Sequence, residues 1–139
     1  MNVVPDASVV VKWFVPERHH EPARALRDDY LEGHHDLVVP ALLPLEVTNA
    51  LKYSQFHDEE RLSVAAESLV EYGLELRPFG RSGAVAETAV ELGITVYDAS
   101  YLALAAALDC PAYTADERML EAVSETDDAE RVTHIADYR

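Results

Sequence analysis

Two aspartates bracket the most apolar stretch of the sequence, residues 95–116. Asp98 precedes residues 99–108, which are apolar at every position except Ser100, so we expect a helix buried on most of its circumference. Residues 111–114 read as a short buried strand, and Asp116 follows it. An acid at a helix start has an ordinary capping role, because its side chain accepts hydrogen bonds from free backbone N–H groups. These two positions alone therefore predict no chemistry.

Two further acids occupy positions that are unusual for a surface carboxylate. Asp6 ends a predicted apolar strand at residues 2–7. Glu46 lies in a predicted helix at residues 41–53, four residues after Leu42 and four before Ala50, in the middle of the apolar stripe. Burial of a lone carboxylate costs several kcal/mol or keeps the group protonated. Glu46 therefore needs a solvent edge or a cationic partner.

The order of predicted elements indicates one α/β domain over residues 1–139. Strands are predicted at residues 2–7, 37–39, 74–78, 111–114 and 132–135, and helices at 9–14, 22–31, 41–53, 58–72, 83–92, 99–108 and 117–123. Proline cannot donate to a strand ladder, so Pro5 is expected at the last rung of the first strand. The alternation is typical of a mainly parallel sheet covered on both faces, with sites at the carboxyl ends of its strands.

In such a sheet the four acids share one place. They are Asp6, Glu46, Asp98 and Asp116. Four carboxylates repel one another unless they bind cations or protons, and oxygen ligands without His or Cys select Mg²⁺ or Mn²⁺. Such ions activate water and brace phosphodiester oxygens during hydrolysis. Ser8 and Thr114, each two residues from an acid, either hold these carboxylates or make local turn hydrogen bonds.

Composition sets the cellular context. The chain is 49% hydrophobic, and its single Cys110 permits no internal disulfide, which fits a reducing cytoplasm. No segment has a signal-peptide pattern or the ~20 apolar residues of a membrane span, so we expect a cytoplasmic protein without a membrane partner.

The charge balance is strongly acidic. Twenty-six Asp and Glu residues face 11 Lys and Arg residues, giving a formal net charge of -15, which opposes binding of a polyanion. High-salt adaptation in a halophilic host and a basic protein partner both fit this charge. Bound divalent ions would then supply positive charge locally, helped by a basic rim at Lys12, Arg18, Arg24 and Arg27, with Lys12 as a substrate contact.

Two histidine pairs, His19-His20 and His34-His35, invite a zinc interpretation. Adjacent histidines project in different directions, and the sequence has no HExxH or CxxC spacing. The pairs are therefore interpreted as loop residues rather than metal ligands.

The four acids occur in segments that resemble PIN-domain ribonucleases, in particular the toxins of VapBC toxin–antitoxin modules. The segments are DASVVVKWFVPE (6–17), PLEVTNAL (44–51), YDASYLALA (97–105) and YTADERML (113–120), and together they span nearly the whole chain. The resemblance implies a three-layer α/β/α fold and a Mg²⁺- or Mn²⁺-dependent endoribonuclease. It assigns metal ligation to the four acids and supporting roles to Ser8, Asn49 and Thr114. Pro5 departs from the aliphatic residue usual before the first acid.

The same resemblance implies a cognate antitoxin whose basic side chains enter the acidic site, and a homodimer of the nuclease. Two alternatives stay open: an RNA-processing PIN nuclease without a toxin role, and a PIN scaffold that binds metal without cleaving. A phosphatase of the haloacid dehalogenase type needs a second acid where this chain has Ser8, and a receiver domain needs a late lysine, but none follows Lys52.

Overall fold

The computed structural model describes residues 1–54 and 58–139, and its strands form one parallel sheet. The strands are β1 (Asn2–Pro5), β2 (Asp36–Pro40), β3 (Glu75–Arg77), β4 (Ala112–Thr114) and β5 (Val132–His134). The helices are α1 (Ala7–Val10), α2 (His20–Leu31), α3 (Leu43–Lys52), α4 (Glu59–Glu71), α5 (Ser82–Leu92), α6 (Val96–Leu108) and α7 (Glu117–Val123), with 3₁₀ turns η1 (Val11–Trp13) and η2 (Ile135–Asp137). The predicted α/β class and parallel sheet are confirmed.

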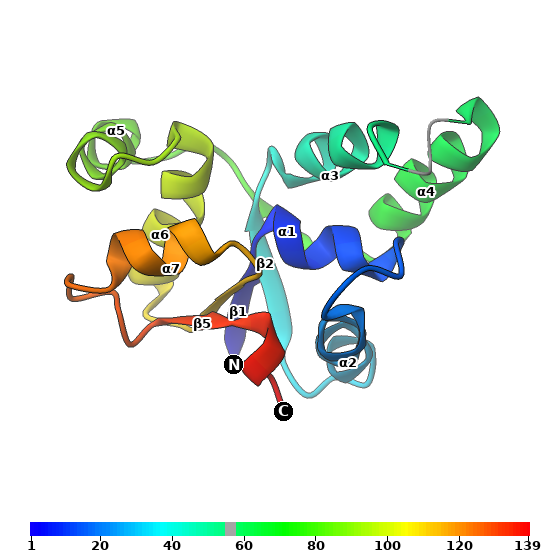
Figure 1. Ribbon diagram of the computed structural model, residues 1–139, viewed down its shortest axis with the longest axis horizontal. Coiled ribbons are helices and arrows are strands. Elements are labelled where there is room, and N and C mark those ends of the chain that lie inside the picture. The colour runs from blue at the N-terminus through cyan, green and yellow to red at the C-terminus, as the bar shows by residue number, and fades with distance from the viewer. Residues whose placement is uncertain (55–57) are drawn as a thin grey trace.

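Three layers build the molecule, with α5, α6 and α7 on one side of the sheet and α1 to α4 on the other (Figure 1). Both chain termini lie at the amino ends of the strands, and the starts of α1, α3 and α7 lie toward the opposite end. The carboxyl ends of the strands are thus left for loops and helix starts, which is where open α/β sheets carry their sites.

The strands lie in the order β3-β2-β1-β4-β5, and all are parallel. The chain builds the sheet outward from β1 on one side through β2 and β3, and then returns to the other side of β1 with β4 and β5. The crevice outside the carboxyl ends of β1 and β4 is therefore the topological switch point. Asp6 follows β1 and Asp116 follows β4 closely, so the sheet brings together two acids that are far apart in sequence.

Proline is tolerated in the central strand because of where its missing N–H would lie. The bonds that join β1 to β4 come from the N–H groups of Val4 and Asp6, which donate to Pro111 (2.9 Å) and Tyr113 (3.0 Å). Pro5 stands between these donors, so its missing N–H removes no bond to β4. The expectation that Pro5 is the last residue of the strand is confirmed.

The main core packs apolar side chains from β1, β2 and the flanking helices. Val4, Val9, Val39, Leu43 and Val47 are fully buried within it. β1 and β2 bury side chains on both faces, as expected for strands covered by helices on both sides.

Helix α6 begins earlier than predicted, at Val96 rather than residue 99. Thr95 is its N-cap and accepts the N–H of Asp98 at 3.0 Å, so the cap is a hydroxyl and Asp98 stands inside the first turn. The prediction of burial around most of the helix is also wrong in part, because Ala106 and Ala107 are exposed. A long apolar run cannot show which of its faces lacks a neighbour.

Other element ends and faces differ in detail. Asp58 caps α4 by accepting the N–H of Arg61, and Gly93 ends α5 in the left-handed conformation (φ 66°), as its position suggested. Ala50, predicted in the apolar stripe of its helix, is exposed, and so are the apolar residues Val70 and Ala84. Helix periodicity places a face only to within about one residue.

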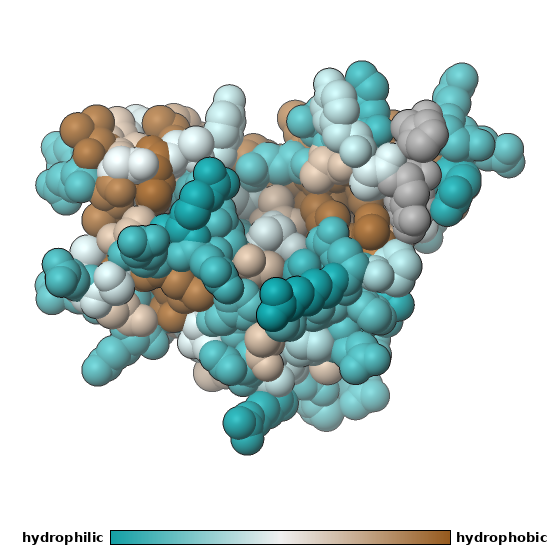
Figure 2. All heavy atoms as spheres, in the orientation of Figure 1, coloured by the Kyte–Doolittle hydropathy of each residue, from teal (hydrophilic) through white to brown (hydrophobic). Residues whose placement is uncertain are grey.

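Hydrophilic side chains cover much of the face that Figure 2 shows, while apolar side chains gather over α5 and beside α3 and α4. Within the described part of the chain, no single helix is long and apolar enough to cross a membrane, and α5 and α6 pass that test only as a pair bent by 116°.

Candidate active site

Asp6 is the most enclosed of the four acids, with 7% of its surface exposed. It caps α1, where its carboxylate accepts the N–H of Val9 at 3.3 Å. Ser8 Oγ donates to one carboxylate oxygen and Thr114 Oγ1 to the other, each at 2.5 Å. Burial raises the pKa of Asp6 to about 6, against the lowering effect of these hydrogen bonds.

The two hydroxyls also connect β1 to the loop after β4. Ser8 Oγ accepts the N–H of Ala115 at 2.8 Å, and Thr114 Oγ1 accepts the N–H of Asp116 at 3.0 Å. Each hydroxyl is thereby oriented to donate to Asp6, so both oxygens of that buried side chain receive hydrogen bonds. This arrangement suits the ionised form, although burial disfavours it.

Glu46 projects from α3 toward α6, where Tyr101 donates its phenolic proton to the carboxylate at 2.6 Å. Burial raises the pKa of Glu46, the Tyr101 hydrogen bond lowers it, and the charge of Asp98 raises it further. Tyr101 is 2% exposed, and its pKa is raised by burial and then by this same carboxylate. Sequence analysis placed Glu46 inward correctly but missed Tyr101.

Asp98 is the electrostatic centre of the group. Burial raises its pKa, a hydrogen bond with Thr95 lowers it, and the charge of Asp116 raises it again. Its own charge raises the pKa of Asp6 and of Glu46. Asp98 therefore lies close enough to Asp6, Glu46 and Asp116 to interact electrostatically with each of them, as expected for acids at one end of the sheet.

Asp116 is partly exposed and caps α7. Its carboxylate accepts the backbone N–H of Arg118 at 2.9 Å, and the Arg118 guanidinium lies 3.5 Å away on a side chain that is 91% exposed. This exposed arginine lies within ion-pair distance of Asp116, and its charge also lowers the pKa of Asp98, although burial outweighs that effect.

The donor set fits hard divalent cations. It consists of carboxylate oxygens and hydroxyls, with no thiolate or imidazole among the predicted residues, which favours Mg²⁺ or Mn²⁺ over Zn²⁺. Asp6 accepts hydrogen bonds as a carboxylate, but its burial disfavours the ionised form and raises its pKa. A nearby cation would stabilise the ionised form. Asp6, Glu46, Asp98 and Asp116 are the residues able to hold such an ion.

The other predicted site residues lie in different settings. Asn49 is exposed one turn after Glu46 on α3. Lys12 is buried and its ammonium pairs with Glu17 at 3.1 Å, so it does not lie open to a substrate as expected. Of the predicted basic rim, Arg27 pairs with Asp28 and Arg24 donates to the Lys12 carbonyl. A lysine in an otherwise apolar segment buries its stem and finds a local acid.

A second acidic group lies at the far end of the molecule. Among the described residues, Asp29, Glu32 and His34 form the one group with three candidate ligand atoms within 4.8 Å of one another. His34 lies 3.4 Å from Asp29 and 3.8 Å from Glu32, and Tyr138 donates to Asp29. Asp29 thus has a histidine and a tyrosine as partners, whereas Asp6 has two hydroxyls, Glu46 has a tyrosine and Asp116 has the exposed Arg118.

The fold and the acids at its switch point define a PIN-like protein, and comparison supports this directly. A family profile described as PIN domain matches residues 3–125. The chain belongs to the PIN domain family, in agreement with the resemblance of its four segments. No curated protein matches the sequence.

Solved structures agree on the fold. The chain is similar to PAE2754 from Pyrobaculum aerophilum (TM-score 0.66, 20% identity, 97% of this chain and 90% of that one). It is also similar to FitAcB from Neisseria gonorrhoeae (TM-score 0.64, 19% identity, 88% of this chain and 93% of that one). A third similar structure is VapBC2 from Rickettsia felis bound to a DNA fragment from their promoter (TM-score 0.61, 13% identity, 96% of this chain and 98% of that one). At these identities the likeness concerns the fold.

Proposed function

We propose that this protein is a Mg²⁺- or Mn²⁺-dependent endoribonuclease that hydrolyses RNA phosphodiester bonds as the toxin of a type II toxin–antitoxin pair. The observation that carries the proposal is the coupled carboxylate group at the β1/β4 switch point. Burial and mutual repulsion raise the pKa of Asp6, Glu46 and Asp98 there, while hydroxyls and a tyrosine donate to the ionised forms. Such a group is suited to a divalent cation.

The four acids share one role in this proposal, and neighbouring side chains support them. Asp6, Glu46, Asp98 and Asp116 would hold the metal, which when bound would lower the pKa of water and stabilise charge on the phosphate. Ser8 and Thr114 fix both oxygens of Asp6, which sets the direction of its remaining lone pairs. Tyr101 holds Glu46 by one oxygen and leaves the other free to bind. Asn49, one turn from Glu46, orients groups at the rim.

The activity is tested with the purified full chain and a structured RNA. Cleavage is expected with Mg²⁺ or Mn²⁺ and should disappear with EDTA and return when the metal is restored. Glu46→Gln is expected to abolish cleavage, because the amide cannot contribute a negative ligand, while Glu71→Gln at the exposed end of α4 is the matched control. Metal-independent cleavage, or full activity of Glu46→Gln, would overturn the mechanism.

An antitoxin partner and a homodimer belong to the same proposal. The similarity to VapBC2 supports it, since the four segments resemble toxins of VapBC modules. An arginine from a partner would meet several carboxylates and form charge-assisted bidentate bonds that shield the metal ligands. Expression of the natural operon should yield a complex with a small basic protein. Isolation of the nuclease chain alone from that operon would favour RNA processing without a toxin role.

A further inference from the structure

A pocket of about 510 Å³ lies beside the carboxylate group, between the loops that follow β2 and β3 and the helices α5 and α6. Helices α5 and α6 contribute apolar lining residues, among them Val85, Ala103 and Leu104. The segment after β3 contributes Phe79 and Arg81. The backbone closes one side, because the N–H of Ala41 donates to the carbonyl of Arg77 at 2.8 Å.

The pocket adjoins the acids through the two elements that carry them. Tyr97 lines the pocket and directly precedes Asp98 in the first turn of α6. Leu42 lines it as well, and its carbonyl accepts the backbone N–H of Glu46 at 3.1 Å. A nucleotide bound here would therefore lie next to a phosphodiester held at the carboxylates.

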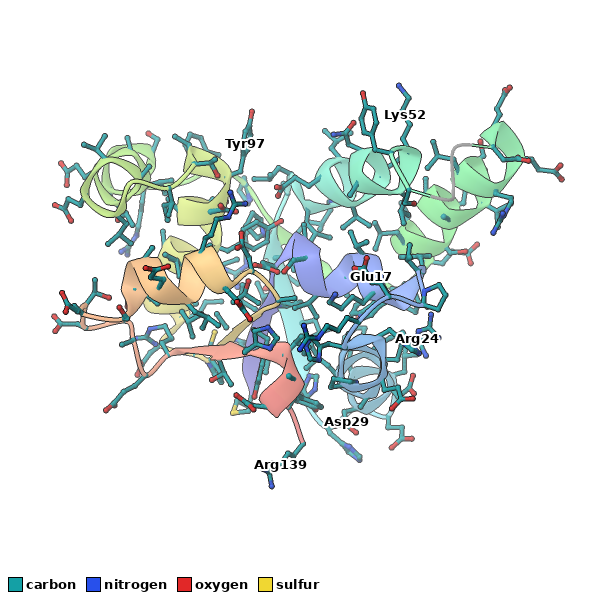
Figure 3. The ribbon with its side chains drawn as sticks, viewed as in Figure 1. Glu17, Arg24, Asp29, Lys52, Tyr97 and Arg139 are labelled. Carbon is teal, nitrogen blue, oxygen red and sulfur yellow. The ribbon has the colours of Figure 1, made fainter. Side chains whose placement is uncertain are left out.

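The pocket offers the contacts that a nucleotide needs. Phe79 and Tyr97 expose 62% and 61% of their surfaces, and Figure 3 shows Tyr97 projecting outward from the start of α6. Exposed aromatic rings stack on nucleobases regardless of sequence, and arginines bind phosphate. Arg77 and Arg81 line the same pocket, and Arg77 also pairs with Glu75 at 2.8 Å. Two cations converge here on a chain of net charge -15.

Arg81 adopts a backbone conformation that an arginine enters at a cost. Its φ is 50°, in the left-handed region, at the start of α5. Glycine would adopt this conformation without strain. The chain thus presents a long cationic side chain at a position where local stability favours glycine, and such outliers gather at functional sites.

We propose that this pocket binds a nucleobase of the RNA next to the cleaved bond, with Phe79 and Tyr97 stacking on the base and Arg81 contacting a flanking phosphate. The inference rests on the proposed nuclease function and adds a substrate subsite to it. It also explains how an acidic protein binds RNA without a broad basic face, because stacking of aromatic rings on bases is little affected by the net charge of the protein.

Fluorescence anisotropy with a labelled single-stranded RNA tests the proposal, using the full chain carrying Glu46→Gln, with Mg²⁺ present. Phe79→Ala in this background is expected to weaken binding about tenfold, the usual effect of losing one stacked base. The same RNA with abasic sites should bind the two proteins equally. Tyr53→Ala, which removes another exposed aromatic ring outside the pocket, is the matched control and should bind as the parent.

Arg81→Gly separates binding from stability. It should raise the melting temperature, because glycine relieves the left-handed strain, while it weakens RNA binding. Arg139→Ala at the distant terminus is the matched charge control. Unchanged RNA affinity in Phe79→Ala and Arg81→Gly, in a protein whose wild type cleaves RNA with metal, would overturn the subsite and leave the nuclease intact. A change of oligomeric state in Phe79→Ala would overturn it too, in favour of contact between two copies.

Discussion

The two ends of the sheet each gather acidic side chains, but in opposite electrostatic states. At the carboxyl end, burial and neighbouring charge raise the pKa of Asp6, Glu46 and Asp98. At the amino end, hydrogen bonds from Tyr138 and His34 lower the pKa of Asp29. Figure 3 shows Asp29 near Arg139 and far from Tyr97.

Proximity alone would select a group other than the four predicted acids. Asp29, Glu32 and His34 have their ligand atoms within 4.8 Å of one another, and the bonds of Asp29 to His34 and Tyr138 join α2 to the following loop and to the C-terminal turn. The carboxylates at the other end lie near like charges, and the partners of Asp6 and Glu46 are hydroxyls, while the exposed Arg118 pairs with Asp116. Repulsion between neighbouring carboxylates therefore distinguishes the four predicted acids from the group at the amino end.

The largest expected effect is on catalysis and separates the two ends. Asp98→Asn should lower metal-dependent RNA cleavage by about a hundredfold or more, because it removes a charge at the centre of the group. Asp29→Asn should leave cleavage unchanged. Initial rates of both variants, with melts to confirm folding, test this. Equal losses in the two variants would remove the distinction between the ends.

The second effect is the pH dependence of stability due to Asp6. Its pKa of about 6 in the folded state lies above its value in the unfolded chain, so the folded state is favoured while the group is protonated. This stability is fully present below about pH 4 and is lost as pH rises through 6, a change of about 3 kcal/mol. Urea unfolding without metal should show that the free energy of unfolding of Asp6→Asn increases relative to that of the wild type between pH 4 and pH 7. A difference between the two free energies that stays constant over this range would contradict the prediction.

Salt should act on the molecule as a whole. With a net charge of -15, repulsion weakens the folded state in dilute buffer, and at ~1 M salt the Debye length falls to about 3 Å. The unfolding midpoint should therefore rise by several degrees between dilute buffer and molar KCl. The unfolding midpoint of Asp98→Asn should rise by nearly the same amount, because salt screens the partly buried Asp98 less than it screens the charges at the surface. Maximal stability in dilute buffer would instead indicate a basic partner for the acidic surface.

The smallest effect concerns the amino end. Tyr138→Phe removes the hydroxyl that donates to Asp29. This hydrogen bond lowers the pKa of Asp29 in the folded state, so it stabilises the fold at pH values above the pKa of Asp29 in the unfolded chain, and that stability is lost as pH falls. The variant should melt slightly lower than the wild type at pH 7 and equally at acid pH. Its RNA cleavage should be unchanged. A loss of cleavage would mean that the two ends are coupled.

The fold followed from the sequence because strand and helix patterns alternate clearly and Asp6 and Asp116 close two strands. Helix faces were less certain, since α6 is apolar around its circumference and only its neighbours decide that Ala106 and Ala107 face solvent. The acids were predicted together because parallel strands share one carboxyl edge.

Partners of individual side chains were harder to predict. Tyr101 was counted as an apolar residue, although a buried tyrosine needs an acceptor for its hydroxyl, and that rule would have pointed to Glu46. Lys12 was assigned to the surface on its charge, but its position in an apolar segment was the better guide. The pocket beside α6 depends on how distant loops meet and had no sequence signal.

The bond from Thr114 to Asp6 spans 108 residues, which determines when the centre can form. During synthesis β1 emerges before β2 and can pair it well before β4, which follows about 70 residues later, has been made. Contacts of such sequence separation form late in folding, because a long loop must close before they contribute. The nascent chain therefore stays without a complete carboxylate centre until β4 and Asp116 have been translated.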